Sequence, residues 1–153
     1  MILKLKQNPH IGECVVNIEY RENDEEALRL VELAQQLSCD GSCLNLRSDN
    51  GIQRIKPEEI LYIEAVDRRT FCYTSARVLE SELRLYEVEE KYSCFGFMRI
   101  SKSCIVNLAR IASLKPDFGG KILCLMDNGE KLYISRQYAP ELKNRLGIGG
   151  KNK

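Results

Sequence analysis

Three short segments of the chain combine arginine or lysine with hydroxyl or amide side chains. They are Asp67-Arg68-Arg69-Thr70, Arg99-Ile100-Ser101-Lys102-Ser103 and Ser135-Arg136-Gln137. Long cationic side chains neutralise phosphates, and Ser or Thr hydroxyls hydrogen-bond to the backbone oxygens of a nucleic acid. Arg can bind guanine through two hydrogen bonds, and Gln can bind adenine in the same way. The segments are therefore candidates for contact with DNA, and the alternative for each is ordinary solvated surface charge.

Residue groups that perform catalysis are scarce. The chain has no phosphate-binding P-loop and no Gly-x-Gly-x-x-Gly motif. Its one histidine, His10, lies in an expected turn, so a Ser-His-Asp or Cys-His arrangement has little to build on. The tripeptide Asp117-Phe118-Gly119 matches part of a kinase motif set whose other parts are absent, and we interpret it as a turn. The sequence predicts that the protein is not an enzyme.

The seven cysteines are odd in number and irregularly spaced, which argues against a disulfide framework. A structural zinc site needs about four ligands, and neither a second close cysteine pair nor a second histidine supplies them. We therefore expect no metal and no other cofactor. The cysteines are instead expected to act as small buried apolar side chains.

Charge and hydropathy favour a cytoplasmic protein. No run of about 18 apolar residues is present, and residues 1–8 lack the apolar stretch and cleavage site of a signal peptide. The net charge of +1 is unevenly distributed, because residues 1–41 are acidic and hold four Lys or Arg and eight Asp or Glu. Residues 42–148 hold seventeen and fourteen, an asymmetry compatible with nucleic-acid binding by the second part.

The first part of the chain predicts a small β-β-α segment. Strands are expected at 2–7 and 13–20, followed by a helix at about 24–37. Asn23 is a suitable N-cap for that helix, with Glu26 three residues on as in a capping box. The break at residues 38–42 predicts a boundary, which gives a segment 1–41, a domain 42–148 and a disordered tail 149–153.

Residues 42–148 predict an α+β domain that is mainly β. Two hairpin turns are expected at residues 48–51 and 127–129, because Asn and Gly accept positive φ angles. Helices are expected at 81–92, with Leu83, Leu85, Tyr86 and Val88 as candidates for the inner face, and at 137–146, ended by Gly147. Strands are predicted at 43–47, 52–55, 60–66, 71–74, 105–108, 111–114, 121–126 and 131–135.

An ordered series of short pieces within residues 43–146 resembles the LytTR DNA-binding domain of bacterial response regulators. No single piece is specific, but their order and spacing together are. The pieces are Ile60-Leu61-Tyr62-Ile63-Glu64-Ala65, the helix Leu83 to Tyr92, Phe97-Met98-Arg99-Ile100-Ser101-Lys102-Ser103, Ile105-Val106-Asn107-Leu108 with Arg110-Ile111, Asp127-Asn128-Gly129, and Ile134-Ser135-Arg136.

The resemblance implies an antiparallel β-sandwich with two short helices. It also implies that loops, and not a recognition helix, enter successive major grooves of double-stranded DNA at paired direct repeats in promoters. Carried over residue by residue, the contacts fall within the three segments found above, whereas Asn107 is expected to be structural. The implied DNA-binding residues are Arg68, Arg69, Thr70, Arg99, Lys102, Ser103, Arg136 and Gln137.

Two departures from the family pattern qualify the resemblance. Ser101 stands where the family usually has histidine, and residues 1–41 are too short for a phosphoacceptor receiver domain. The chain thus resembles stand-alone LytTR regulators that pair with a small membrane protein that restrains them. Residues 1–41 would then dimerise or hold that partner, or else they complete the core.

Two functions remain open on the sequence. The first is a sequence-specific transcription regulator that binds DNA as a homodimer. The alternative is a protein-interaction module that retains the fold without DNA binding, which the near-neutral net charge and the acidic first segment would suit.

Overall fold

The computed structural model describes residues 18–21, 24–38 and 43–148, and the chain divides into two compact units, 1–40 and 41–153. In the first unit, helix α1 spans Glu25–Ser38. Asp24 is its N-cap, because the Asp24 carboxylate accepts a hydrogen bond from the Ala27 N–H at 3.2 Å. The predicted cap, Asn23, and with it the predicted capping box to Glu26, lies outside the described residues. The strand expected at 2–7 and most of that at 13–20 also lie outside them, while residues 18–20 form no strand.

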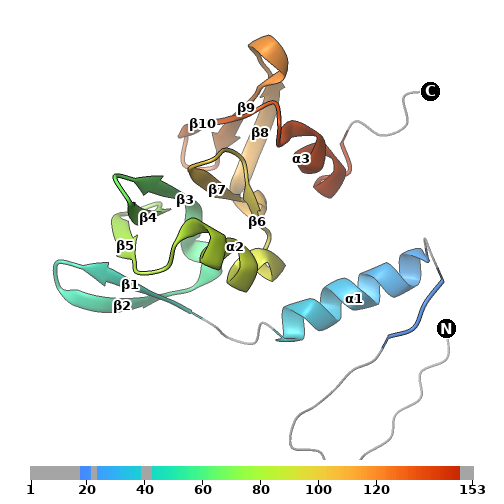
Figure 1. Ribbon diagram of the computed structural model, residues 1–153, viewed down its shortest axis with the longest axis horizontal. Helices are drawn as coiled ribbons and strands as arrows, with labels where there is room; N and C mark the ends of the chain where they lie inside the picture. The colour runs from blue at the N-terminus through green and yellow to red at the C-terminus, as the bar shows by residue number, and fades with distance from the viewer. Residues whose placement is uncertain (1–17, 22–23, 39–42, 149–153) are drawn as a thin grey trace, which may run out of the picture. The chain divides into compact units, whose positions relative to one another are not determined.

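The second unit is built from two antiparallel sheets (Figure 1). The larger sheet has the strand order β2-β1-β5-β4-β3-β7-β6, and the smaller has the order β10-β9-β8. The strands are β1 Leu44–Ser48, β2 Gly51–Ile55, β3 Ile60–Val66, β4 Arg69–Thr74, β5 Val78–Ser81, β6 Phe97–Arg99, β7 Cys104–Asn107, β8 Ile111–Pro116, β9 Ile122–Met126 and β10 Lys131–Ile134. The predicted α+β class, mainly β, is confirmed.

Two apolar cores hold these layers together. One core packs helix α2, Leu85–Tyr92, against the larger sheet through residues such as Leu85, Val88 and Ile63. The other joins strands β3, β6 and β7 to the smaller sheet and to helix α3, Ala139–Arg145. Ile100, Ile134 and Leu142 are almost completely buried in it. This second core fixes the loops that follow β6 and β10 relative to each other.

Helix α2 begins at Leu85 and not at Ser81, as the sequence had predicted. The reason is that Ser81 ends strand β5, where it pairs with Leu46 and Thr70 on the two neighbouring strands. With the later start, the buried stripe is Leu85, Val88 and Tyr92. Tyr86, predicted for the inner face, is 62% exposed.

The predicted turns are confirmed, with one difference in their geometry. Gly51 and Gly129 have φ angles of 101° and 89°, whereas the preceding asparagines keep negative φ. Helix α3 contains Pro140 in its first turn, as expected. It ends at Gly147, whose φ is 65°, and the Ile148 N–H donates to the Lys143 carbonyl at 2.8 Å.

Three of the cysteines are inert core residues. Burial raises the pKa of the Cys72 and Cys104 thiols to about 12 and that of the Cys124 thiol to about 11. These thiols are therefore protonated at neutral pH and are neither nucleophiles nor metal ligands in that state. Within the described part of the chain, no three His, Cys, Asp or Glu side chains gather closely enough to hold a metal ion. No described helix is long and apolar enough to span a bilayer.

Candidate nucleic-acid interface

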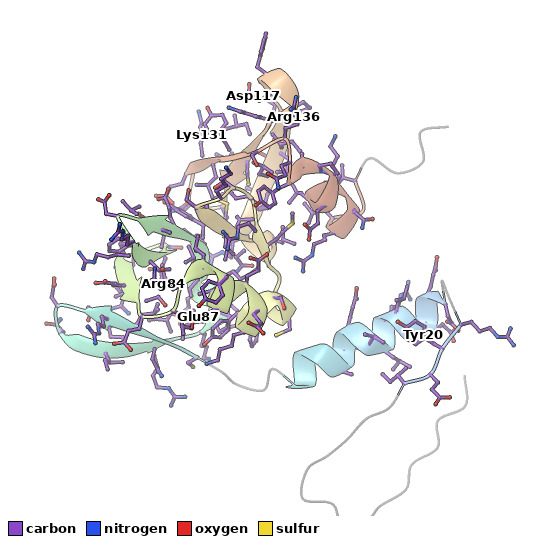
Figure 2. All side chains as sticks on the ribbon, viewed as in Figure 1. Tyr20, Arg84, Glu87, Asp117, Lys131 and Arg136 are labelled. Carbon is purple, nitrogen blue, oxygen red and sulfur yellow. The ribbon has the colours of Figure 1, made fainter. Side chains whose placement is uncertain are left out.

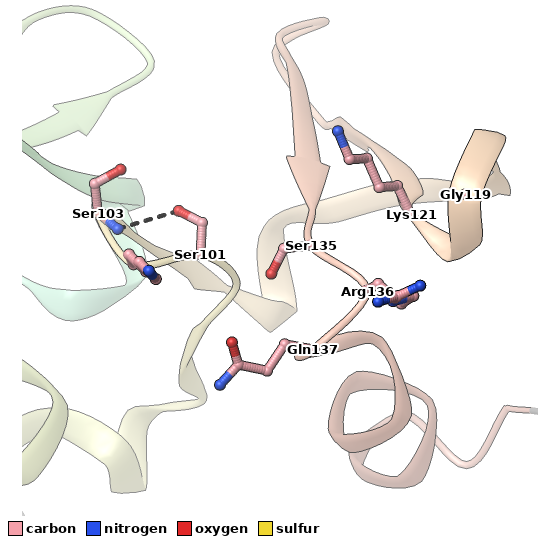
Figure 3. A pocket seen from close by; sticks show the side chains of 8 residues that line it. Ser101, Ser103, Gly119, Lys121, Ser135, Arg136 and Gln137 are labelled. Carbon is pink, nitrogen blue, oxygen red and sulfur yellow. Dashed lines mark hydrogen bonds between the residues drawn. The ribbon is translucent and has the colours of Figure 1, made fainter.

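Two of the three predicted segments meet in one open hollow of about 710 Å³ at the end of the second core (Figure 3). The β6–β7 loop and the β10–α3 connection supply most of its lining, although they are more than thirty residues apart in the sequence. The β8–β9 turn supplies the remainder. The lining residues are Ser101, Lys102, Ser103, Gly119, Lys121, Ser135, Arg136 and Gln137.

A backbone hydrogen bond joins the two main walls of the hollow. The Ser135 N–H donates to the Ile100 carbonyl at 2.9 Å. The Ser135 carbonyl in turn accepts the Tyr138 and Ala139 N–H groups, which starts helix α3. Arg136 and Gln137 therefore lie in a turn that is tied on one side to the β6–β7 loop and on the other to a helix.

The β6–β7 loop is held in shape by its own hydrogen bonds. The Ser103 N–H donates to Ser101 Oγ at 3.2 Å, as Figure 3 shows. Arg99 donates from Nε to Glu89 Oε2 at 3.0 Å and from a terminal nitrogen to the Lys102 carbonyl at 2.8 Å. The Arg99 side chain is only 16% exposed. Arg99 therefore shapes the loop from beneath, while Lys102 and Ser103 face solvent.

The β8–β9 turn packs against the stem of Arg136. A Cβ atom on Gly120 would lie 3.0 Å from both Cγ and Cδ of Arg136, which is closer than such atoms ordinarily approach. Figure 2 places Arg136 and Asp117 together at this end of the unit, far from Arg84 and Glu87 beside helix α2. The absence of a side chain at Gly120 thus allows the Arg136 stem to lie flat on the turn.

The third predicted segment begins in the turn between β3 and β4. Asp67 and Arg68 have φ angles of 50° and 65°, and Val66 pairs with Arg69, so the loop has two residues. Such turns favour Asn-Gly, and an arginine with positive φ is uncommon. The Ala65 N–H donates to the Ser103 carbonyl at 2.8 Å, which sets this turn beside the β6–β7 loop. Arg68 is exposed in this turn, three residues beyond the Ala65 that is bonded to Ser103.

The other two residues of that segment are placed differently. The Arg69 guanidinium donates to the Glu80 carboxylate at 2.8 Å and lies over the Phe71 ring at 5.3 Å. This pair raises the pKa of Arg69 and lowers that of Glu80. Arg69 also lines a separate hollow beside Arg47. Thr70 is only 6% exposed. The hollow therefore excludes Arg69 and Thr70.

The cations around the first hollow are free of ion pairs. Among the residues that the structure describes, the ion-paired arginines are Arg47, Arg69, Arg99 and Arg110. Lys102, Lys121, Arg136 and Arg68 are exposed and have no carboxylate partner there. An unpaired cation keeps its full attraction for an external anion, because no protein carboxylate has to be displaced first.

A family model described as the LytTr DNA-binding domain matches residues 50–147. The chain belongs to the LytTr DNA-binding domain family. A solved LytTr DNA-binding domain from Bacillus cereus superposes with a TM-score of 0.66 at 29% identity, covering 70% of this chain and 98% of that one. The match to the family confirms the resemblance drawn from the sequence.

Curated relatives are similar to this chain over about two thirds of its length. The Sensory transduction protein LytT of Bacillus cereus is 31% identical over 105 residues, which are 69% of this chain and 43% of the relative. An Uncharacterized HTH-type transcriptional regulator of Staphylococcus aureus is 32% identical over 100 residues, 65% of this chain and 67% of the relative. The chain spans about half the length of the LytT relatives that it matches.

The LytTr asparagine expected to be structural is indeed buried. Asn107 is 2% exposed, and its amide donates to the Pro57 and Ile60 carbonyls at 3.3 and 2.9 Å. Its side-chain oxygen accepts the Ala109 N–H at 3.1 Å. Asn107 therefore joins the end of β7 to the start of β3, from within the core.

Sequence reasoning missed one residue of the LytTr hollow, Lys121. It is separated from the three predicted segments and has no hydroxyl or amide neighbour of the kind that marked them. The signal that was available is the pair Gly119-Gly120 directly before it, which predicts a tight turn with a cation at its exit. The pairing of β9 with β10, in which Ile122 lies opposite Ile134, brings that turn to Arg136.

Proposed function

We propose that this protein is a sequence-specific transcription regulator that binds double-stranded DNA through the cationic end of its LytTr domain. The carrying observation is the convergence of the loops that follow β6, β8 and β10 on one hollow, whose exposed cations have no carboxylate partner among the described residues. The interface consists of Arg68, Lys102, Ser103, Arg136 and Gln137, which the sequence had singled out, together with Lys121. Arg69, Thr70 and Arg99 are left out, because each is paired or buried.

The chemistry of each side chain in this interface indicates whether it binds phosphates or bases. Lysine is a compact point charge suited to phosphates, so Lys102 and Lys121 hold the DNA backbone. Arg136 and Gln137 stand side by side on a rigid turn and offer the groups that distinguish guanine and adenine in the major groove. Arg68 projects from the neighbouring turn and reaches the adjacent stretch of duplex.

The proposal extends to the assembled regulator. One surface of this size covers a single half-site, so two copies bind paired direct repeats in a promoter. The name of the Staphylococcus relative, a transcriptional regulator, agrees with this role. Residues 1–41, in which eight Asp or Glu outnumber four Lys or Arg, form the contact between copies or with a small membrane protein that restrains the regulator in the cytoplasm.

Selection from a pool of random duplexes tests the proposed function directly. We expect the wild-type protein to enrich a defined sequence, and its binding to weaken steeply with salt. Neutralising four phosphates gives a slope of log K against log salt of about −3.6. Fluorescence anisotropy between 50 and 300 mM salt measures the slope, with a scrambled duplex as the control. Equal affinity for the enriched and scrambled duplexes, or no binding to either, contradicts the proposal.

Replacing Arg68 by glycine is expected to raise stability while weakening DNA binding. A non-glycine residue in the left-handed region costs about 1–2 kcal/mol, which glycine relieves. The same change removes one cation from the interface and makes the salt slope shallower by about 1. Urea unfolding and anisotropy provide the two measurements.

Asp67→Gly is the matched control, because Asp67 shares the turn and the positive φ but carries no positive charge. It should stabilise the fold without weakening DNA binding. If Arg68→Gly retained full affinity for the selected duplex, Arg68 would have to be removed from the interface.

A further inference from the structure

The tip of the β8–β9 turn carries a fully projecting aromatic ring. Phe118 is 94% exposed, more than any other large apolar side chain in the described part of the chain. Scattered exposed apolar residues are common on protein surfaces. The others that are more than half exposed, such as Ile52 at 70%, lie within helices and strands, where backbone geometry dictates which side chains face outward. Phe118 lies at a turn, where polar residues are the usual choice.

The turn that carries Phe118 is closed and well defined. The Asp117 N–H donates to the Lys121 carbonyl at 2.9 Å across its base. Gly119 and Gly120 have φ angles of 70° and 78°, which allow the chain to reverse within a few residues. A rigid turn holds the ring in place before any partner arrives, which lowers the entropy lost on binding.

The surroundings of the ring favour a polyanionic partner. Gly119 and Lys121 line the same hollow as Lys102 and Arg136, and Gly120 supports the Arg136 stem. Residues 115–121 include two lysines and one carboxylate, so the net charge of this segment is positive. A protein partner that buried Phe118 would also have to pair the unpaired cations beside it. A DNA duplex offers phosphates for those cations and apolar base and sugar surfaces for the ring.

We infer that the β8–β9 turn is a fourth DNA-contacting element, in which Phe118 makes an apolar contact within the duplex and Lys121 binds a neighbouring phosphate. The inference rests on the proposed function and extends it to the β8–β9 turn. Apolar side chains contact thymine methyl groups or wedge between base steps. Phe118 therefore contributes affinity without contributing charge.

The salt dependence of DNA binding distinguishes the contribution of the Phe118 ring from that of the Lys121 charge. Phe118→Ala should weaken binding to the selected duplex roughly tenfold and leave the salt slope unchanged, because no phosphate contact is lost. Phe118→Leu should retain most of the affinity. Lys121→Gln should weaken binding and make the slope shallower by about 1. Ile52→Ala is the control, since Ile52 lies on β2 at the edge of the larger sheet opposite β6.

A photoreactive side chain supplies a direct readout of contact. Phe118→p-benzoylphenylalanine should cross-link to the selected duplex on illumination, and the same replacement at Ile52 should not. Because the Phe118 side chain is 94% exposed, its variants are expected to melt at the wild-type temperature, which circular dichroism checks.

Several results would overturn this inference alone. They are wild-type affinity for Phe118→Ala, a salt slope that changes with Phe118→Ala, or cross-links to protein in place of DNA. In each case the wild-type protein would still select a DNA sequence. Failure of the wild-type protein to select any duplex would instead reject the proposed function, and the two failures are therefore distinguishable.

Discussion

Arg136→Ala is expected to weaken binding to the selected duplex by about 1–3 kcal/mol, which is roughly a five- to hundredfold rise in Kd, and to relax base preference at one position of the site. Arg136 is exposed, unpaired among the described residues and supported along its stem by Gly120. Its guanidinium is therefore available for a bidentate bond, and its orientation is restricted before DNA arrives.

One further variant at position 136 separates the role of charge from that of side-chain geometry, and a variant elsewhere serves as its control. Arg136→Lys keeps the positive charge but cannot form the planar fork, so it should retain the salt slope and lose base preference. Arg84→Ala removes an exposed arginine far from the hollow (Figure 2) and should leave specific binding unchanged. If Arg136→Lys kept full base preference, the role of Arg136 would be reduced to holding a phosphate. Competition assays with single-base variants of the duplex measure the preference.

Asn107→Asp is expected to destabilise the fold by about 3 kcal/mol at neutral pH, despite almost no change in size. The wild-type amide donates to the Pro57 and Ile60 carbonyls. An ionised carboxylate would place a buried negative oxygen against both carbonyls and leave them without a donor. In acid, where the new carboxyl is protonated and can donate one hydrogen bond, part of the loss should be recovered. Urea unfolding at pH 7 and pH 4 gives the measurement.

Asn45→Asp provides the matched control for this second prediction. Asn45 is an asparagine on strand β1 with an exposed side chain, so its replacement should change stability by less than about 0.5 kcal/mol. A comparable loss for both variants would indicate a general effect of added negative charge. It would remove the special role assigned to the buried amide of Asn107.

The backbone of the loops that carry the proposed interface is held in place by hydrogen bonds between the loops. Backbone hydrogen bonds connect the β6–β7 loop to the start of the β10–α3 connection, from Ser135 to Ile100, and to the end of β3, from Ala65 to Ser103. These bonds do not involve the side chains that we propose contact DNA. Side chains in the loops can therefore change to suit a different target sequence while the backbone stays in place.

Much of the architecture was predictable from the sequence. Strand β3 was predicted at the bounds it has, because apolar residues fill it except at Glu64. The hairpins at Gly51 and Gly129 followed from turn chemistry. The helix that begins at Leu85 was predicted to begin at Ser81. Ser81 belongs to strand β5 because it pairs with β1 and β4, and that pairing joins residues distant in sequence.

The candidate site, like the fold, was predictable from the sequence in part. Residue types and a family resemblance determined which segments carry DNA-binding chemistry, since cations, hydroxyls and amides are properties of single residues. Only the tertiary structure decided which of those side chains are available. Arg99 is turned to Glu89, Arg69 to Glu80, and Thr70 into the interior. Lys121 joins the site through sheet pairing. Availability depends on burial and on partners from other strands, and those are fixed only when strands remote in sequence pack together.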